Sequence, residues 1–210
     1  MALDKSTLAS DILSVFDDMK KNYKTEGYDG DDAFAKGLAK AFKDFGEGGK
    51  ITTVDTGAVS AGAFTGKGEG SLTLSDSASY STLLSAVKEM KANNKDDDYL
   101  AGQIKTALED MYDASDIVET SVSGTIVISS GGSTTVSGAS GKGTIKCSFS
   151  AVESGLKSFF ALMKDIDNKK TDSDLADEIA SLVYSAVSSG VVSTFDEGEI
   201  SGASGIGSIS

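Results

Sequence analysis

The 210-residue chain contains 19 lysines and no arginine against 32 acidic residues, and its formal net charge is −13. Such a charge disfavours binding to nucleic acids and to anionic membrane surfaces, which attract basic proteins. The chain also lacks histidine, the usual general base near neutral pH and the commonest metal ligand. We therefore expect no enzyme, no cofactor, no resident metal and no small-molecule substrate.

The first predicted elements are two amphipathic helices. After Ser6 or Thr7 as N-cap, apolar residues recur at helical spacing, and a second stripe follows the acidic segment 29–32, whose carboxylates suit a helix start. Residues 46–49, three of them glycine, are expected to end this second helix in a left-handed cap conformation. The first stripe contains Leu8, Ile12, Val15, Phe16 and Met19, and the second contains Phe34, Leu38, Ala41, Phe42 and Phe45.

A strand and a glycine-rich phrase follow the two helices. Residues 51–54 are β-branched and predict a strand. The glycine-rich phrases at 137–145 and 201–209 are nearly the same, and 61–72 is a looser copy of them. We interpret each phrase as a tight turn between two short strands, because glycine adopts positive φ without steric cost.

The same order of elements is predicted three times. A Met-Lys pair ends each first helix, and an apolar-Ala pair opens each second helix. The spacing to the strand also recurs, since Ile51, Ile117 and Val192 lie nine positions after Phe42, Leu108 and Val183. The second copy adds a strand at 125–128 and a turn at 130–133, which together resemble a hairpin. Such self-similarity predicts internal repeats.

We therefore predict an α+β fold of three tandem pseudo-equivalent units, at residues 1–76, 77–149 and 150–210. Each unit is a helical pair followed by a short antiparallel β-hairpin with a Gly/Ser-rich turn. A lone hairpin is marginally stable, so the units are expected to pool their strands within the chain or between chains. The last strand carries no charge and is expected to offer a free edge to another subunit. The predicted contact residues are Ile200, Ser201, Gly202, Ala203, Ser204, Gly205, Ile206, Gly207, Ser208 and Ile209.

Candidate reactive motifs are weak. The segment 141–144, Gly-Lys-Gly-Thr, departs from the phosphate-loop pattern because glycine follows the lysine and a strand comes next. The acidic segments 29–32, 96–98 and 172–174 lack the calcium-loop spacing and fit helix capping, with weak divalent binding as the alternative. Serines have no histidine to activate them, and the lysines lie on polar faces. Cys147 is read as a buried free thiol or as a bridge between subunits.

The chain resembles small virion-structural proteins from the head, neck and tail genes of tailed bacteriophages. The resemblance rests on three sequence features: Phe34-Ala35 with Leu38 and Phe42, the strand 51–54, and the closing phrase 202–210. It implies a non-enzymatic structural component of a tail, baseplate or neck, which assembles with itself and other virion proteins. It also implies localisation in the virion after synthesis in the host cytoplasm.

An alternative function is a surface-exposed, adhesin-like module that binds sugar or protein through its glycine-rich loops. The N-terminal 20 residues lack the features of a secretory signal, and no apolar run approaches the length of about 20 residues that spans a bilayer. An enzyme of unknown type is the third hypothesis, which the missing residue classes disfavour.

Overall fold

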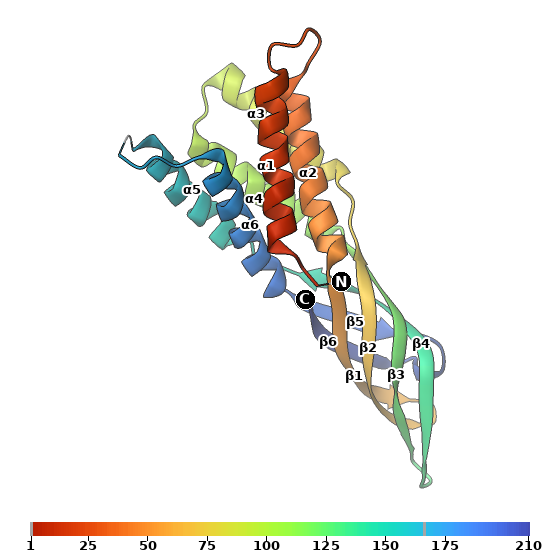
Figure 1. Cartoon of the computed structure of the whole chain (residues 1–210). Helices are drawn as coiled ribbons and strands as arrows, with labels where there is room; N and C mark the ends of the chain where they lie inside the picture. Colours follow the sequence, from red (N-terminus) through yellow and green to blue (C-terminus); the bar gives the residue numbers. More distant parts are fainter. Residues whose placement is uncertain (1, 166) are drawn as a thin grey trace.

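The computed structural model describes residues 2–165 and 167–210, and it confirms the α+β class. Helices gather at one end of the molecule and strands extend from the other (Figure 1). The elements run helix, helix, strand, strand three times, with a short 3-10 helix between the last two strands. They are α1 (Lys5–Asn22), α2 (Gly30–Gly48), β1 (Lys50–Val59), β2 (Gly62–Thr73), α3 (Ser77–Asn93), α4 (Asp97–Asp113), β3 (Asp116–Ile128), β4 (Ser133–Lys146), α5 (Ser150–Lys164), α6 (Asp172–Ser188), β5 (Val191–Asp196), η1 (Gly198–Ile200) and β6 (Ala203–Ile209).

The ends of the first two helices differ slightly from the prediction. Asp4, rather than Ser6 or Thr7, caps α1, because its carboxylate accepts the backbone N–H groups of both residues at 2.9 and 3.2 Å. Helix α2 continues through the glycine run to Gly48, and Gly49 has φ −73°. The expected left-handed cap is therefore wrong for this helix.

The acidic segments 29–32 and 96–98 cap the second helix of their pairs, as predicted, whereas the cap of the third pair lies one residue before the segment 172–174. Asp29 accepts two backbone N–H groups at the start of α2, and Asp96 accepts one at the start of α4. Thr171 caps α6, and Asp174 completes a capping box with it. These side chains satisfy donors that the first helical turn leaves free.

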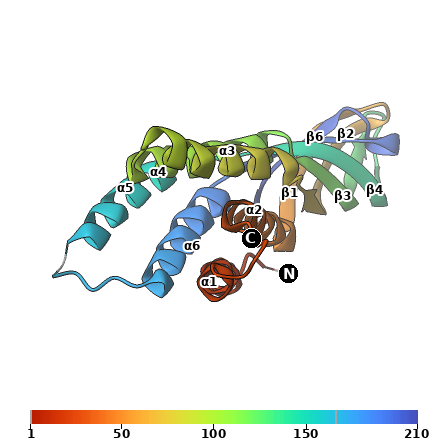
Figure 2. The same cartoon turned by 90° about the horizontal axis from the view of Figure 1, so that it is seen from above.

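The six helices pack in a closed circuit. Each helix contacts the next one along the chain, and α6 returns to contact α1 (Figure 2). The lysine at the end of each first helix forms an ion pair with an aspartate at the start of a second helix. The two helices that are joined in this way belong to different helix-helix-strand-strand units. These ion pairs are Lys20–Asp172 at 2.5 Å, Lys91–Asp31 at 2.5 Å and Lys164–Asp97 at 3.2 Å.

The strands of all three pairs share one closed antiparallel barrel in the order β1-β2-β3-β4-β5-β6. Strand β6 pairs with β5 on one side and with β1 on the other. Reciprocal backbone hydrogen bonds of 2.8 and 3.0 Å between Lys50 and Ser210 extend this last pairing. The expected free edge of the terminal strand is therefore wrong, because the first strand of the chain covers it. The pooling of strands is confirmed, and it occurs within the chain.

The interpretation of the glycine phrases as turns is also wrong. They form most of β2, β4 and β6, the second strand of each hairpin. The predicted turn at 130–133 is confirmed, and Gly131 and Gly132 there have φ values of 100° and 95°. The glycines inside the strands have a different role, because several of them lie against side chains in the barrel interior.

Two separate apolar clusters fill the molecule. The larger lies between the helices and the adjacent end of the barrel, where Ile51, Ile117 and Val192 begin the first strand of each hairpin. The smaller fills the far end of the barrel around Phe64 and Ile126. Among the described residues, none of the helices combines the length and apolar composition that crossing a membrane requires.

Candidate functional site

A layer of buried carboxylates crosses the barrel between the two apolar clusters. Asp55 on β1, Glu119 on β3 and Asp196 on β5 are 0%, 0% and 5% exposed. One oxygen from each lies within 4.8 Å of the others. Buried acids are normally paired with a cation or a lysine. Within residues 2–165 and 167–210, no lysine forms an ion pair with any of the three.

The local hydrogen bonds satisfy only part of this layer. The Thr53 hydroxyl lies 2.9 Å from Asp55 Oδ1 and also contacts Glu119 Oε1. Among the described residues, Glu119 Oε2, both carboxylate oxygens of Asp196 and the hydroxyl of Thr194 have no hydrogen-bond partner. A buried polar atom without a partner costs roughly 1–3 kcal/mol, so this layer calls for a ligand or for protons.

Glycines of the repeated phrase make the space for these side chains. A Cβ atom at Gly68 or at Gly141 would collide with the carboxylate of Glu119, and one at Gly205 would collide with that of Asp55. Polar side chains therefore project inward from the first strand of each hairpin, whereas the second strand lines the interior with glycine. This arrangement explains why the phrases are strands.

The environment raises the pKa of all three acids. Burial raises the pKa of Asp55 and of Glu119, and the hydroxyl of Thr53 opposes the rise in both cases. At Glu119 the neighbouring charge of Asp55 adds to the rise in pKa, and the nearby hydroxyl of Thr194 also opposes it. Burial, with the neighbouring Asp55 and Glu119, raises the pKa of Asp196 to about 6. Burial in a low dielectric and nearby like charge both disfavour the ionised form. The layer therefore favours a neutralised state.

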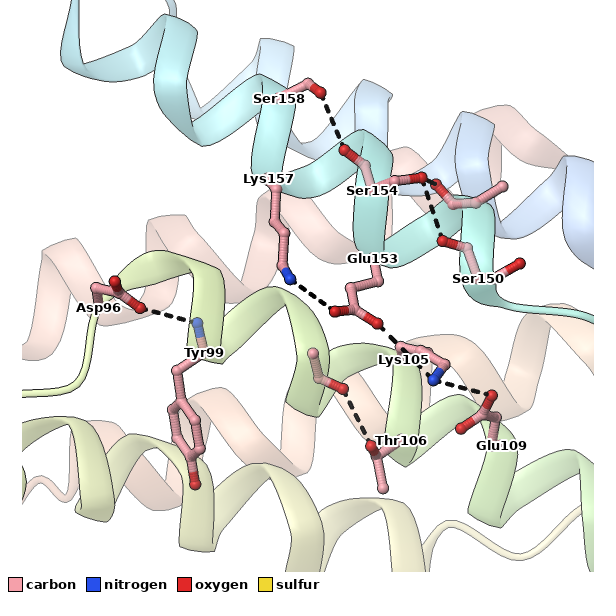
Figure 3. Close-up of polar contacts among 12 residues, drawn as sticks. Asp96, Tyr99, Lys105, Thr106, Glu109, Ser150, Glu153, Ser154, Lys157 and Ser158 are labelled. Atoms are coloured by element: carbon pink, nitrogen blue, oxygen red, sulfur yellow. Dashed lines mark hydrogen bonds and ion pairs between the residues drawn. The ribbon is translucent and has the colours of Figure 1, made fainter.

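Several of the serines and lysines have structural partners on the helices. On α5, Lys157 pairs with Glu153 at 2.7 Å, and Glu153 also reaches Lys105 of α4 at 3.8 Å (Figure 3). The hydroxyl of Ser154 donates to the backbone carbonyl of Ser150 in its own helix. The phosphate-loop-like segment lies within β4, and its Lys142 pairs with Glu197 at 3.1 Å.

The outer wall of the barrel has an uncharged face over β5, β6 and β1. Ile206 at its centre is 68% exposed and pairs with Val54, which is 59% exposed. On the other side Ile206 pairs with Ser193, so Val191 and Phe195 lie diagonally next to it. Nine outward positions in the middle of this face carry no charge. They are Thr52, Val54, Thr56, Val191, Ser193, Phe195, Ser204, Ile206 and Ser208. The face is bordered by charged residues: Lys50 at the start of β1, Lys67 of β2, which pairs with Val54, and Lys142 of β4, which pairs with Phe195.

The predicted contact residues divide between the two sides of the barrel wall. Ile200, Ala203, Gly205 and Ile209 are buried inside this chain, so they are not available to a partner, and Gly207 is half-buried. The exposed ones are Ser201, Gly202, Ser204, Ile206 and Ser208. Contact through these exposed residues stays a prediction.

The interior acids were missed by sequence reasoning, which looked for metal ligands in the acidic segments before the helices. A local signal exists in the phrase Thr-x-Asp, which occurs at 53–55 and again at 194–196 inside otherwise apolar or small strands. The placement of the glycine phrases in strands also removes the loops on which the adhesin-like alternative depended. Searches of protein-family models, of curated proteins and of solved structures found no match to this chain.

Proposed function

We propose that the chain is a non-enzymatic structural protein that assembles with copies of itself through the uncharged face over β5, β6 and β1. The observation that carries this proposal is the exposure of Phe195 and Ile206, at 72% and 68%, on one continuous wall. Exposed apolar side chains are ordinary when scattered, whereas a contiguous group is typical of an interaction surface.

Charge favours a second copy of the chain as the occupant of this face. Each copy has a formal net charge of −13, so two copies repel one another over most of their surfaces. The repulsion is smallest where both partners are uncharged. A contact that uses the same face on both copies meets this condition and closes as a two-fold dimer.

We also propose that residues 1–76, 77–149 and 150–210 are pseudo-equivalent units. The repeated order of elements supports this proposal, as do the three ion pairs that link the recurring Met-Lys positions to the start of a second helix. A chain with approximate three-fold symmetry presents similar faces to a symmetric ring of neighbours. Its resemblance to tailed-phage proteins supports the tail, baseplate or neck of a virion as the position of such a ring.

Light scattering coupled to sizing chromatography tests the contact. We expect the mass of the wild-type chain to rise with concentration, and Ile206→Lys to return it to that of a monomer. Val127→Lys is the matched control, because Val127 is 60% exposed on β3, outside the proposed face. The contact is rejected if both variants assemble like the wild type.

Mass spectrometry of purified phage particles tests the setting. We expect the protein in particles at a fixed number of copies per particle. Its absence from particles would remove the virion proposal and leave the self-contact to be judged by the scattering data alone.

A further inference from the structure

The carboxylate layer of the barrel is independent of the outer face and has a chemistry of its own. We propose that the barrel interior binds one hard divalent cation, Ca²⁺, through Asp55, Glu119 and Asp196. This site would hold the three hairpins together from inside.

The donor set selects the class of metal. The layer offers carboxylate and hydroxyl oxygens, and the chain has no histidine and keeps its one cysteine outside the layer. Oxygen-only sites suit Ca²⁺ and Mg²⁺, whereas Zn²⁺ and Cu²⁺ prefer nitrogen or sulfur ligands. Three carboxylates supply up to six oxygens, which matches the six to eight that Ca²⁺ takes.

The spacing of the oxygens fits a shared ion. Ligand oxygens lie about 2.3–2.6 Å from Ca²⁺, so oxygens on opposite sides of the ion are roughly 5 Å apart. The three acids place one oxygen each within 4.8 Å of the others. One oxygen of each carboxylate is therefore close enough to the other two to share a single ion.

The hydroxyl of Thr194 is a second, separate indication of a ligand. Thr194 is 1% exposed, and its hydroxyl lies near the carboxylate of Glu119 but makes no hydrogen bond of regular geometry among the described residues. A Cβ at Gly205 would lie 2.5 Å from this hydroxyl and would also collide with Asp55, so both oxygens face the same space. A cation there would satisfy the free oxygens and neutralise the carboxylates together.

The site is enclosed, which determines how it must be loaded. Apolar clusters close the barrel above and below the layer, and Asp196, at 5%, is the most exposed of the three acids. Metal exchange with the folded chain is expected to be slow. The test therefore refolds the full chain from denaturant in chelator or in 1 mM CaCl₂, MgCl₂ or MnCl₂, followed by removal of free metal.

Elemental analysis and thermal unfolding are the measurements. We expect about one Ca²⁺ retained per chain and a rise in Tm of roughly 5–10 °C over the chelator-treated protein. The double variant Asp55→Asn, Asp196→Asn should retain no Ca²⁺ and show no Ca²⁺-dependent shift. Glu26→Gln, which removes an exposed charge in the α1–α2 loop, is the control and should behave as wild type.

If the double variant does not fold, the single variant Asp196→Asn provides the same comparison. It should retain less Ca²⁺ than the wild type, with a smaller Tm shift. The proposal is overturned if the wild type retains no Ca²⁺ and its Tm does not move with Ca²⁺. It is also overturned if the variants keep the full Ca²⁺-dependent shift. Neither result bears on the oligomeric state that tests the outer face.

Discussion

Thr53 on β1 contacts the carboxylate of Glu119 on β3, 66 residues further along the chain, inside the barrel. The same hydroxyl lies 2.9 Å from Asp55, although a hydroxyl has only one hydrogen to donate. The hydroxyl can donate to only one of the two carboxylates, so its oxygen and an oxygen of the other carboxylate are two acceptors in contact. Such a contact is repulsive unless that carboxyl group carries a proton or a cation lies between them. The barrel interior is thus a place where protons and metal compete for the same oxygens.

The close fit of glycine against the acids makes a prediction for stability. Gly205→Ala should lower the free energy of unfolding by roughly 2–4 kcal/mol, because the new methyl group would collide with Asp55 and displace its carboxylate. Gly48→Ala is the control, since its Cβ would meet nothing within 4 Å, and it should change stability by less than about 1 kcal/mol. Urea denaturation measures both. Equal effects of the two substitutions would contradict the spacer role.

The raised pKa of Asp196 predicts how stability varies with pH in chelator. Its folded pKa of about 6 exceeds the usual 3.8, so the native state binds more protons than the unfolded state between these values. Stability should therefore fall as pH rises through this window, and we expect a loss of about 1–1.5 kcal/mol between pH 5 and pH 7.5. Acids with lowered pKa, such as Glu153, do not titrate in that range. Chemical denaturation at each pH provides the measurement.

Two comparisons make this pH prediction specific. Asp196→Asn should make the profile less steep, because one titrating group is gone while Asp55 and Glu119, whose pKa values are also raised, remain. With Ca²⁺ bound, the stabilisation by metal should shrink as pH falls, since protons displace the ion. A profile that rises from pH 5 to pH 7.5 in chelator would contradict the raised pKa.

The buried hydroxyl of Tyr112 predicts a neutral or stabilising substitution. Tyr112 is 1% exposed, its ring packs against Phe149 at 5.3 Å, and its hydroxyl has no hydrogen-bond partner in the described part of the chain. Tyr112→Phe should leave stability unchanged or raise it by up to about 1 kcal/mol, because an unsatisfied polar group is removed. Tyr80→Phe is the matched control. It should cost about 1 kcal/mol, since the Tyr80 hydroxyl donates to Asp32 at 2.5 Å. A loss in Tyr112→Phe as large as in Tyr80→Phe would refute this account.

The thiol of Cys147 is predicted to react slowly. It lies just after β4, and burial raises its pKa to about 12, so little thiolate exists at pH 8. We expect its reaction with Ellman's reagent to be at least about 100-fold slower in the folded chain than in denaturant. A fast reaction in the folded state would instead support the alternative of a bridge between subunits.

Local patterns were sufficient for the helices and for the start of each first strand. The apolar stripe around Leu38 and Phe42 formed the buried face of α2, and Ile51 begins the buried part of β1. Such patterns can be read within a short window, because the residues that face the core recur at a fixed spacing along a helix or a strand. The acidic segments became caps for the same reason, since a cap acts within three residues.

The glycine strands and the interior acids depend on contacts that no local window contains. A phrase such as 201–209 has little intrinsic strand preference, and its extended form is fixed by pairing with both β1 and β5. Asp55 and Glu119 meet only because the barrel closes around them. The prediction of a free edge on the last strand was wrong for the same reason, since that edge is covered by β1, the first strand of the chain.

This closure constrains synthesis of the chain on the ribosome. Strand β1 is the first strand to emerge from the ribosome. One of its two neighbours in the barrel is β6, which lies about 150 residues further along the chain. Until residues 203–209 are released, β1 and β5 each present an unpaired edge, and the acids between them remain open to water. A nascent chain stalled before that point would therefore be a target for chaperones or for pairing with another incomplete chain, a hazard that the finished barrel no longer has.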